Sequence, residues 1–316
     1  MCSSELVSLS DIQAAAERIA PYIFHTPVVP MVPSGLKLKA ENLQPVGAFK
    51  IRGAFNAILS LTGEERKRGV IAHSSGNHAQ AVAYAAQRLG VKAVIVIPNN
   101  APAVKVEATR RCGAEIHLVD FLGDARTEVC AALAREHGYV LVPPYESMRI
   151  VAGTGTIGLE ILAQAPDVRA LYVPVSGGGL IAGVAAAIKQ SNPAIRVIGV
   201  EPEFANDAQR SLREGRIVRV PPEETLRTMA DGLRVSQLGE IPWAHIRAYV
   251  DDIVTVSEAQ IGAAMRYIAA ESRLIAEPSG AVAAAAALAS GGSLETTVAI
   301  VSGGNVEAKL FASMLA

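Results

Sequence analysis

The segment ALYVPVSGGGLIAGVAAAIKQ, residues 170–190, contains a strand, a turn and a helix in direct succession. Residues 170–175 form a short apolar run typical of a buried strand, and residues 180–190 have a helical pattern. Gly177, Gly178 and Gly179 join the two without a polar loop. A strand that passes through a tight turn into a helix is the repeating unit of a parallel sheet, so this segment predicts the α/β class.

The same alternation of strand-like and helix-like segments continues through most of the chain. Six short apolar segments are typical of buried strands: 92–98, 115–119, 139–143, 170–175, 195–200 and 296–301. Helical patterns lie between them, and Gly90 and Gly138 are placed to end two of these helices. The strands fall into two series, and Pro143 and Pro144 mark the crossing point. Two series predict two domains, each a parallel sheet covered by helices on both faces.

The composition indicates a globular protein with a sizeable core. Half of the 316 residues are hydrophobic and 19% are charged, which is unlike a disordered chain. The formal net charge of −1 gives no reason to expect nucleic acid or a membrane surface as a partner. The first residues lack a basic segment followed by an apolar one, so no signal peptide is expected. Three cysteines without CxxC spacing fit a reducing cytoplasm, and neither a disulfide framework nor a zinc site is expected.

Three glycine-containing turns are placed at strand C-termini: HSSGNH at 73–78, VSGGGL at 175–180 and VSGGN at 301–305. Open α/β sheets bind ligands at the carboxyl ends of their strands. The three glycines of the second turn would form a cradle of backbone N–H groups suited to a phosphate, although a plain tight turn is the alternative. GTGTIG at 153–158 fits a dinucleotide fingerprint, but it has no clean strand before it, so a nicotinamide site is a remote alternative.

The stretch VGAFKIRGAF, residues 46–55, raises a question about Lys50. A helix here would have a polar face and an apolar face: Arg52, Asn56 and Ser60 on one, and Ile51, Phe55 and Ile58 on the other. Lys50 lies on neither face. Its helical neighbours Gly53, Ala54 and Ala57 are all small, and small residues predict free space above the lysine. A solvated helix lysine is the alternative.

These segments together resemble the fold-type II pyridoxal-phosphate enzymes of the serine/threonine dehydratase and serine racemase group. The matching segments follow in family order: 41–57, 73–81, 151–161, 173–183, 200–211, 228–233, 276–286 and 301–306. The resemblance implies the α/β architecture of the tryptophan synthase β-subunit, with two parallel-sheet, three-layer domains. Residues 1–50 and 147–316 would form the large cofactor-binding domain. Residues 51–146 would form the small domain that carries the substrate loop.

The resemblance also implies roles for individual residues around pyridoxal phosphate. Lys50 would form the Schiff base, and the cofactor ring would fill the predicted space. The other cofactor-binding residues would be Phe49 beside the ring, Asn77 at the ring hydroxyl, Ser176, Gly177, Gly178, Gly179 and Leu180 at the phosphate, and Ser302 at the pyridine nitrogen. A neutral hydroxyl cannot keep that nitrogen protonated as a carboxylate would. The ring is then a weaker electron sink, which favours loss of a β-substituent over transamination.

The substrate would lie against the first glycine-containing turn. The resemblance implies Ser75 as a second catalytic residue, on the cofactor face opposite Lys50, where it could return the α-proton and permit racemisation. A helix-capping hydroxyl is the alternative for Ser75. The expected substrate-binding residues are Ser74, Ser75, Asn77, His78 and Arg126. Backbone N–H groups at this helix start would hold the carboxylate. Arg126, taken alone, is typical of a solvated helix charge.

The segment VEPEFAND carries a further prediction, for a cation. Glu201, Asp207 and the backbone carbonyl of Ala205 match the Mg²⁺ or Ca²⁺ site of the serine racemase branch. Hard cations prefer oxygen ligands of these kinds. The metal would have a structural role. Two exposed carboxylates after a strand are the alternative.

We therefore expect a cytoplasmic, homodimeric pyridoxal-phosphate enzyme that binds a small amino-acid substrate. It would be a dehydratase, or ammonia-lyase, that converts L-threonine or L-serine to 2-oxobutanoate or pyruvate and ammonia. Alternatives within the family are a serine racemase and a threo-3-hydroxyaspartate dehydratase or racemase. Arg234 and Val235 stand where the racemase branch tends to have Lys and Ser, which counts against efficient racemisation and against nucleotide activation. An NAD-dependent oxidoreductase and a cofactor carrier without turnover are the alternatives of other classes.

Overall fold

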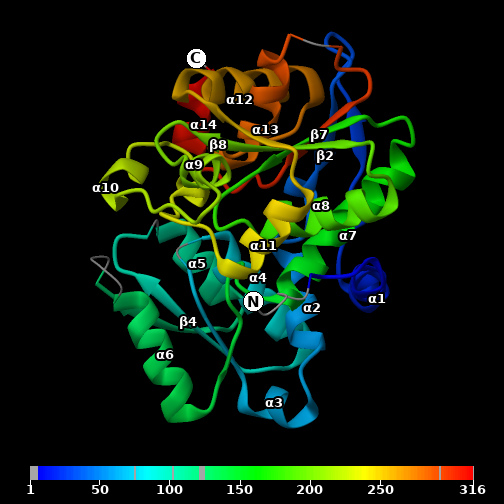
Figure 1. The fold of residues 1–316 in the computed structure, drawn as a ribbon. Coiled ribbons are helices and arrows are strands. Elements are labelled where there is room, and N and C mark those ends of the chain that lie inside the picture. The colour runs from blue at the N-terminus through cyan, green and yellow to red at the C-terminus, as the bar shows by residue number, and fades with distance from the viewer. Residues whose placement is uncertain (1–5, 75, 102, 121–124, 292, 316) are drawn as a thin grey trace.

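The computed structural model describes residues 6–74, 76–101, 103–120, 125–291 and 293–315, which form two sheets with helices on both faces (Figure 1). The larger sheet has the strand order β1-β2-β10-β7-β8-β9, and the smaller sheet has the order β5-β4-β3-β6. Among the described strands, β1 pairs antiparallel with β2, and every other pair is parallel. The predicted α/β class with two parallel-sheet domains is confirmed.

The strands have the following bounds: β1 Val28–Pro30, β2 Lys37–Ala40, β3 Val70–His73, β4 Ala93–Pro98, β5 Glu115–Val119, β6 Val140–Leu141, β7 Ala170–Pro174, β8 Arg196–Pro202, β9 Asp252–Val256 and β10 Thr297–Val301. The six strands predicted from the sequence are all present. The predicted domain limits, 1–50 with 147–316 and 51–146, stay a prediction.

The α-helices have the following bounds: α1 Leu9–Ile19, α2 Lys50–Leu59, α3 Gly63–Arg68, α4 Asn77–Leu89, α5 Ala103–Arg111, α6 Ala125–His137, α7 Met148–Gln164, α8 Gly179–Ser191, α9 Asp207–Glu214, α10 Pro222–Thr225, α11 Glu240–Tyr249, α12 Glu258–Ser272, α13 Pro278–Ala289 and α14 Ala308–Leu315. Three short 3-10 helices accompany them: η1 Ala20–Tyr22, η2 Glu41–Leu43 and η3 Asp231–Leu233. Gly90, which ends α4, has the left-handed conformation that the sequence predicts for it. Among the described residues, no helix is both long enough and apolar enough to cross a membrane.

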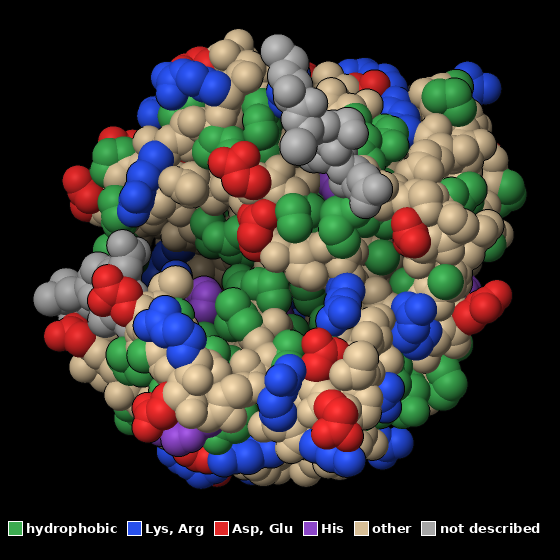
Figure 2. Space-filling model, turned by 60° about the horizontal axis from the view of Figure 1, so that its bottom comes forward, with side chains coloured by type: hydrophobic (Ala, Val, Ile, Leu, Met, Phe, Trp, Pro, Cys, Tyr) green, Lys and Arg blue, Asp and Glu red, His purple; other side chains and the backbone are tan. Residues whose placement is uncertain are grey.

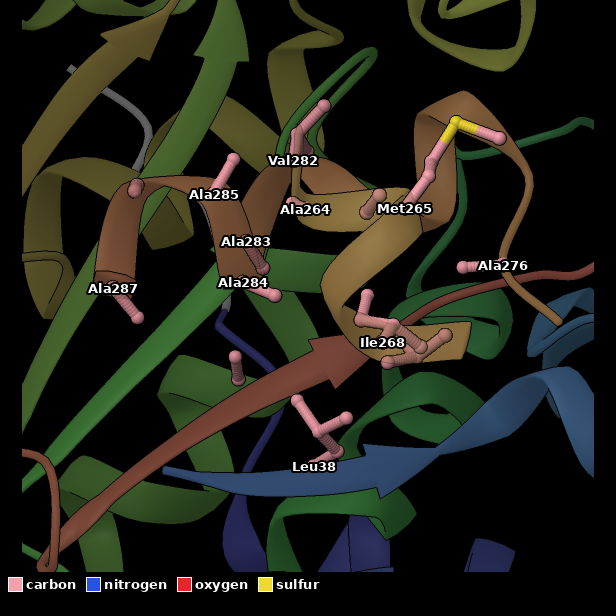
Figure 3. Packing of buried hydrophobic residues seen from close by; sticks show 14 of the residues in the cluster. Leu38, Ala264, Met265, Ile268, Ala276, Val282, Ala283, Ala284, Ala285 and Ala287 are labelled. Atoms are coloured by element: carbon pink, nitrogen blue, oxygen red, sulfur yellow. The ribbon is translucent and has the colours of Figure 1, made fainter. Parts of the chain in front are cut away.

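Helices cover both faces of each sheet, so each forms three layers. Helices α12 and α13 pack on one face of the larger sheet, and α7, α8 and α11 pack on the other (Figure 1). Helix α13 consists mostly of alanine, and its buried side chains pack against Leu38 of β2 and Ile268 of α12 (Figure 3). Small side chains let α13 lie close to the sheet. In the smaller sheet, α4 and α6 lie on opposite faces.

The glycines of GTGTIG lie within helix α7 and not in a turn after a strand. A Cβ on Gly153 would lie 2.8 Å from the carbonyl oxygen of Arg52 in α2, and a Cβ on Gly158 would lie 2.8 Å from the Cβ of Ala187 in α8. Such separations are too short for any side chain. The motif therefore lets three helices pack closely, and it supplies no phosphate loop.

Helix α2 is held in place by buried ion pairs. Arg52 has no exposed surface, and its guanidinium donates to both carboxylate oxygens of Glu41 and of Glu160 at 2.6–2.9 Å. Lys39, also fully buried, donates to Glu160 at 2.5 Å. Arg52 and Asn56 of the predicted polar face are thus buried, and Ser60 is half-buried. The network joins α2 to β2, η2 and α7, and so fixes the position of the first residue of α2, which is Lys50.

Candidate active site

The candidate site lies where the first residue of α2 meets the turn that follows β10. The backbone N–H of Phe49 donates to the carbonyl of Ser302 at 3.0 Å, and Ala48 forms a β-bridge with Gly303. The N–H of Gly304 donates to the carbonyl of Gly47 at 2.9 Å. These bonds bring Lys50 beside the third predicted glycine turn, although the two segments lie at opposite ends of the chain.

Lys50 is a half-buried amine. Its Nζ donates to the carbonyl of Pro144 at 2.8 Å and lies 5.1 Å from the centre of the Phe49 ring. Burial disfavours the charged ammonium and lowers the pKa of Lys50 to about 8. A larger share of neutral amine near neutral pH makes the group a better nucleophile and proton acceptor.

The free space that the small neighbours of Lys50 predict is not found beside Gly53. A Cβ on Gly53 would lie 3.2 Å from the side chain of Ile150 in α7. Ala54 and Ala57 are buried in the same apolar cluster as Ile150. These small residues therefore let α2 pack against its neighbouring helices, while the Lys50 Nζ bonds to the carbonyl of Pro144.

The amide of Asn77, the first residue of α4, is held at both ends. Its Nδ2 donates to Glu277 at 2.5 Å, and its Oδ1 accepts from the Nδ2 of Asn305 at 2.9 Å. A Cβ on Gly303 would lie 3.1 Å from the Asn77 Nδ2, so this amide lies directly over the turn after β10. The amide thus lies beside Gly303, the residue that follows Ser302.

Ser302 has a hydroxyl that is free to change partner. The side chain is buried, and its Oγ donates to the carbonyl of Ser279 over a long 3.4 Å. A weak bond of this length is readily exchanged for one to a ligand atom. The hydroxyl is therefore available to a ligand atom.

The turn after β7 is shaped by glycine. Gly178 has φ +91°, a backbone conformation that favours glycine, and it is the N-cap of α8. A Cβ on Gly177 would lie 2.3 Å from the ring of Tyr145, so no side chain fits there. The hydroxyl of Ser176 is buried and has no hydrogen-bond partner among the described residues. An unpaired hydroxyl beside a helix N-terminus fits an anionic group such as phosphate.

Comparison with known proteins agrees with this geometry. Residues 19–303 match the family model described as pyridoxal-phosphate dependent enzyme. The chain belongs to this family. It is 42% identical over 313 residues to the L-threo-3-hydroxyaspartate ammonia-lyase of Saccharomyces cerevisiae, covering 96% of this chain and 95% of that protein. It is 42% identical over 312 residues to the L-threonine ammonia-lyase of Thermotoga maritima, covering 96% and 77% respectively.

Solved structures give the same result. The structure of maize serine racemase superimposes with a TM-score of 0.93, at 41% identity, over 98% of this chain and 97% of that one. The predicted fold of the tryptophan synthase β-subunit type is thereby confirmed. The protein is a pyridoxal-phosphate enzyme of the lyase and racemase group, with relatives of different named activities.

The described residues fit the cofactor of this pyridoxal-phosphate enzyme. An amine of lowered pKa, a fixed amide and an exchangeable hydroxyl converge at the carboxyl end of the larger sheet. The unpaired Ser176 hydroxyl and the glycine turn lie at the start of α8. The individual cofactor roles of these residues stay predictions.

The substrate turn after β3 is only partly described. The Ser74 hydroxyl accepts from the N–H of Gly76 at 3.2 Å, which shapes the turn. His78 is buried, and its Nε2 lies 2.9 Å from the carbonyl of Val142, so its side chain has a structural contact. Burial, together with the charge of Lys50, lowers the pKa of His78 to about 3 and keeps it neutral. Ser75, the predicted second catalytic residue, lies outside the described residues.

Arg126 lies in the exposed first turn of α6. Burial, and in second place the charge of Arg126, lowers the pKa of His73 to about 4. Arg126 therefore acts electrostatically on the last residue of β3, directly before Ser74. Its predicted contact with a substrate carboxylate stays a prediction.

The predicted metal ligands lie together and are buried. Glu201, Ala205 and Asp207 are at most 1% exposed, so the alternative of two exposed carboxylates is wrong. Glu201 accepts from the N–H groups of Ala208 and Gln209 at 3.0 and 2.8 Å. Both carboxylate oxygens of Asp207 lack a hydrogen-bond partner among the described residues. Burial raises the pKa of Asp207 to about 8.

Side chains alone do not complete a metal centre here. Within the described part of the chain, no group of three or more His, Cys, Asp or Glu residues could hold a metal ion. A cation at Glu201 and Asp207 would therefore need the Ala205 carbonyl and water as further ligands. The two unpaired oxygens of Asp207 are the observation that fits such an ion.

Sequence reasoning missed several residues of this region. Glu277 accepts a hydrogen bond from Asn77 and lies within a segment that matches the family, but the sequence did not predict a function for its side chain. Lys105 of α5 forms an ion pair with Asp231 of η3 across the two sheets, and it was also missed. No local pattern marks these contacts, because each joins residues that are distant in the sequence.

Proposed function

We propose that the protein is an ammonia-lyase that removes the hydroxyl and the amino group of L-threonine or L-serine. The products would be 2-oxobutanoate or pyruvate, and ammonia. The observation that carries the proposal is Lys50, an amine of lowered pKa held beside Ser302 and Asn77. The neutral Ser302 hydroxyl supports elimination over transamination, because it cannot keep a ring nitrogen protonated.

The residues would share the work as follows. Pyridoxal phosphate, when bound, supplies an electron sink for the bond that breaks at Cα. The N–H groups at the start of α4 would hold the substrate carboxylate. Lys50 would accept the α-proton at Nζ. A nearby acidic group would protonate the β-hydroxyl, which would leave as water. The released enamine would hydrolyse to the 2-oxo acid and ammonia.

A second candidate is an enzyme for threo-3-hydroxyaspartate, as a dehydratase or racemase. Two relatives named L-threo-3-hydroxyaspartate ammonia-lyase are 42% and 40% identical to this chain. The positive field of Arg126 at the end of β3 favours a substrate with a second carboxylate. Serine racemisation is the third candidate, and it would need Ser75 on the face opposite Lys50.

The test is a panel of L-serine, D-serine, L-threonine and threo-3-hydroxyaspartate. Both the 2-oxo acid and the remaining enantiomer should be measured for each compound. Release of ammonia and 2-oxo acid from L-threonine or L-serine as the best substrate supports the main proposal. Preference for threo-3-hydroxyaspartate, or racemisation without elimination, would replace it.

We also propose a structural Mg²⁺ or Ca²⁺ ion bound by Glu201, Ala205 and Asp207. The unpaired oxygens of Asp207 support it.

A cytoplasmic homodimer is a further proposal. Three exposed apolar side chains support a dimer: Phe24, Leu43 and Ile275. The side chain of Gln44 donates to the carbonyl of Phe24, and the side chain of Asn42 donates to the carbonyl of Ile275. These two hydrogen bonds hold Phe24 and Ile275 near the segment that contains Leu43.

A further inference from the structure

The orientation of the Asn77 amide is decided by its two partners. The Asn305 Nδ2 donates to Oδ1, so this oxygen faces Asn305 and the Nδ2 must face Glu277. An amide nitrogen carries two hydrogens, and Glu277 accepts one of them. One N–H of Asn77 therefore remains for a ligand, and its direction is set by Glu277 and Asn305 together.

Glu277 is a buried carboxylic acid beside the turn after β10. It is 2% exposed, and its backbone N–H donates to the carbonyl of Gly303 at 3.0 Å, which holds it against the turn after β10. Its Oε2 is buried without a hydrogen-bond partner among the described residues. A buried acid with a free oxygen is costly, and glutamine would fill the same space without a charge. The position thus keeps a group that can gain and lose a proton.

The charges that face Glu277 come from two other elements. Lys105 of α5 is 8% exposed and attracts the carboxylate, while Asp231 of η3 repels it. Lys105 and Asp231 form an ion pair with each other, so their effects on Glu277 partly cancel. Burial is the largest effect and raises the pKa of Glu277 to about 7. Near neutral pH this carboxyl is therefore present in both protonation states.

We propose that Glu277 is a positioning residue for the cofactor ring, which directs one N–H of Asn77 to the ring hydroxyl oxygen and changes the strength of that hydrogen bond with its own charge. This inference rests on the proposed function, which places Asn77 at that oxygen. When Glu277 is charged, it accepts a strong hydrogen bond from one N–H of the Asn77 amide. The second N–H of the same nitrogen is then a weaker hydrogen-bond donor. The charged carboxylate also disfavours negative charge on the ring oxygen. Protonation of Glu277 reverses both effects.

The experiment follows the visible absorption of bound pyridoxal phosphate against pH, without substrate. The wild type should show a spectral change centred near pH 7, where Glu277 titrates. Glu277→Gln retains the size and an acceptor for Asn77 but has no charge, so this change should disappear. An unchanged pH profile in Glu277→Gln, with pyridoxal phosphate bound, would overturn the proposal.

A matched control uses Glu258, another acid with a buried, unpaired oxygen, which accepts from the N–H of Met229. Glu258→Gln should keep the wild-type spectral profile, and loss of the pH-dependent change in this variant would overturn the assignment to Glu277. Asn77→Ala retains Glu277 and its direct electrostatic effect on the ring oxygen, but it removes the hydrogen bond through Asn77. The spectral change should therefore become smaller, and an undiminished change would contradict the role of Asn77.

Two further variants test the direction of the effect. Lys105→Met removes an attractive charge and should move the spectral midpoint to higher pH. Asp231→Asn removes a repulsive charge and should move it to lower pH. A structural role for Glu277 predicts no such opposite shifts, and their absence would overturn the proposal. If the wild type forms no visible band with pyridoxal phosphate at all, the proposed function itself fails, and this inference fails with it.

Discussion

Lys50 shows how one side chain acquires its chemistry from its surroundings. Its Nζ has the carbonyl of Pro144 as hydrogen-bond partner at 2.8 Å. A carbonyl accepts from the neutral amine as well as from the ammonium, so it does not hold the proton as a carboxylate would. Burial then dominates and lowers the pKa from 10.5 to about 8.

The lowered pKa of Lys50 predicts a pH dependence for the protein without cofactor. Between about pH 8 and 10.5, the unfolded chain binds more protons at this lysine than the folded chain does. Lys50 therefore makes a contribution to the free energy of unfolding that increases with pH over this interval. Urea unfolding of wild type and Lys50→Met across the interval checks this. The wild type should gain stability relative to the variant, and a constant difference would contradict the assigned pKa.

Asp207 carries a second prediction at this scale. If the buried carboxylates bind a structural cation, chelation should lower the melting temperature of the protein. Asp207→Ala should remove this sensitivity, because it deletes the two unpaired oxygens. The measurement is thermal unfolding with and without chelator, on protein whose metal content has been determined. If the protein carried metal and chelation changes nothing, the site is not structural.

At the scale of elements, the position of Lys50 depends on how α2 is held. Glycines in α7 and α8 bring helices close together: a Cβ on Gly183 of α8 would lie 2.2 Å from the carbonyl of Val151 in α7. The ion pairs of Arg52 then join α2 to Glu160 of α7 and to Glu41. The first turn of α2 thus has little freedom to move, which suits a residue that must meet a ligand at a fixed point.

Arg52→Ala is predicted to destabilise the fold strongly. It would leave the buried Glu41 and Glu160 without their main partner, and loss of one member of a buried pair typically costs about 3–5 kcal/mol. Chemical denaturation of wild type and variant measures the loss. Asp167→Asn is the control, because Asp167 forms an exposed pair with Lys37 and should change stability little. Equal effects of the two substitutions would contradict the role of the buried network.

At the scale of the whole molecule, the sequence predicts the architecture better than the site. Strand–helix alternation and glycine turns predict two parallel sheets, because these patterns are local. Four of the described strands lie outside the six predicted segments: β1, β2, β3 and β9. The first three have only three or four residues, and β9 is a short edge strand that begins at the second of two aspartates. The contact of Asn77 with Glu277 could not be read from the sequence, since it exists only after the two sheets come together.

The central claim is that Lys50 carries the cofactor and the elimination chemistry. The most direct measurement compares wild type and Lys50→Ala for two quantities: a visible absorption band after addition of pyridoxal phosphate, and ammonia release from L-threonine and L-serine. We predict that the wild type shows both, and that Lys50→Ala loses both while its circular dichroism spectrum stays unchanged. Undiminished ammonia release by Lys50→Ala would contradict the claim.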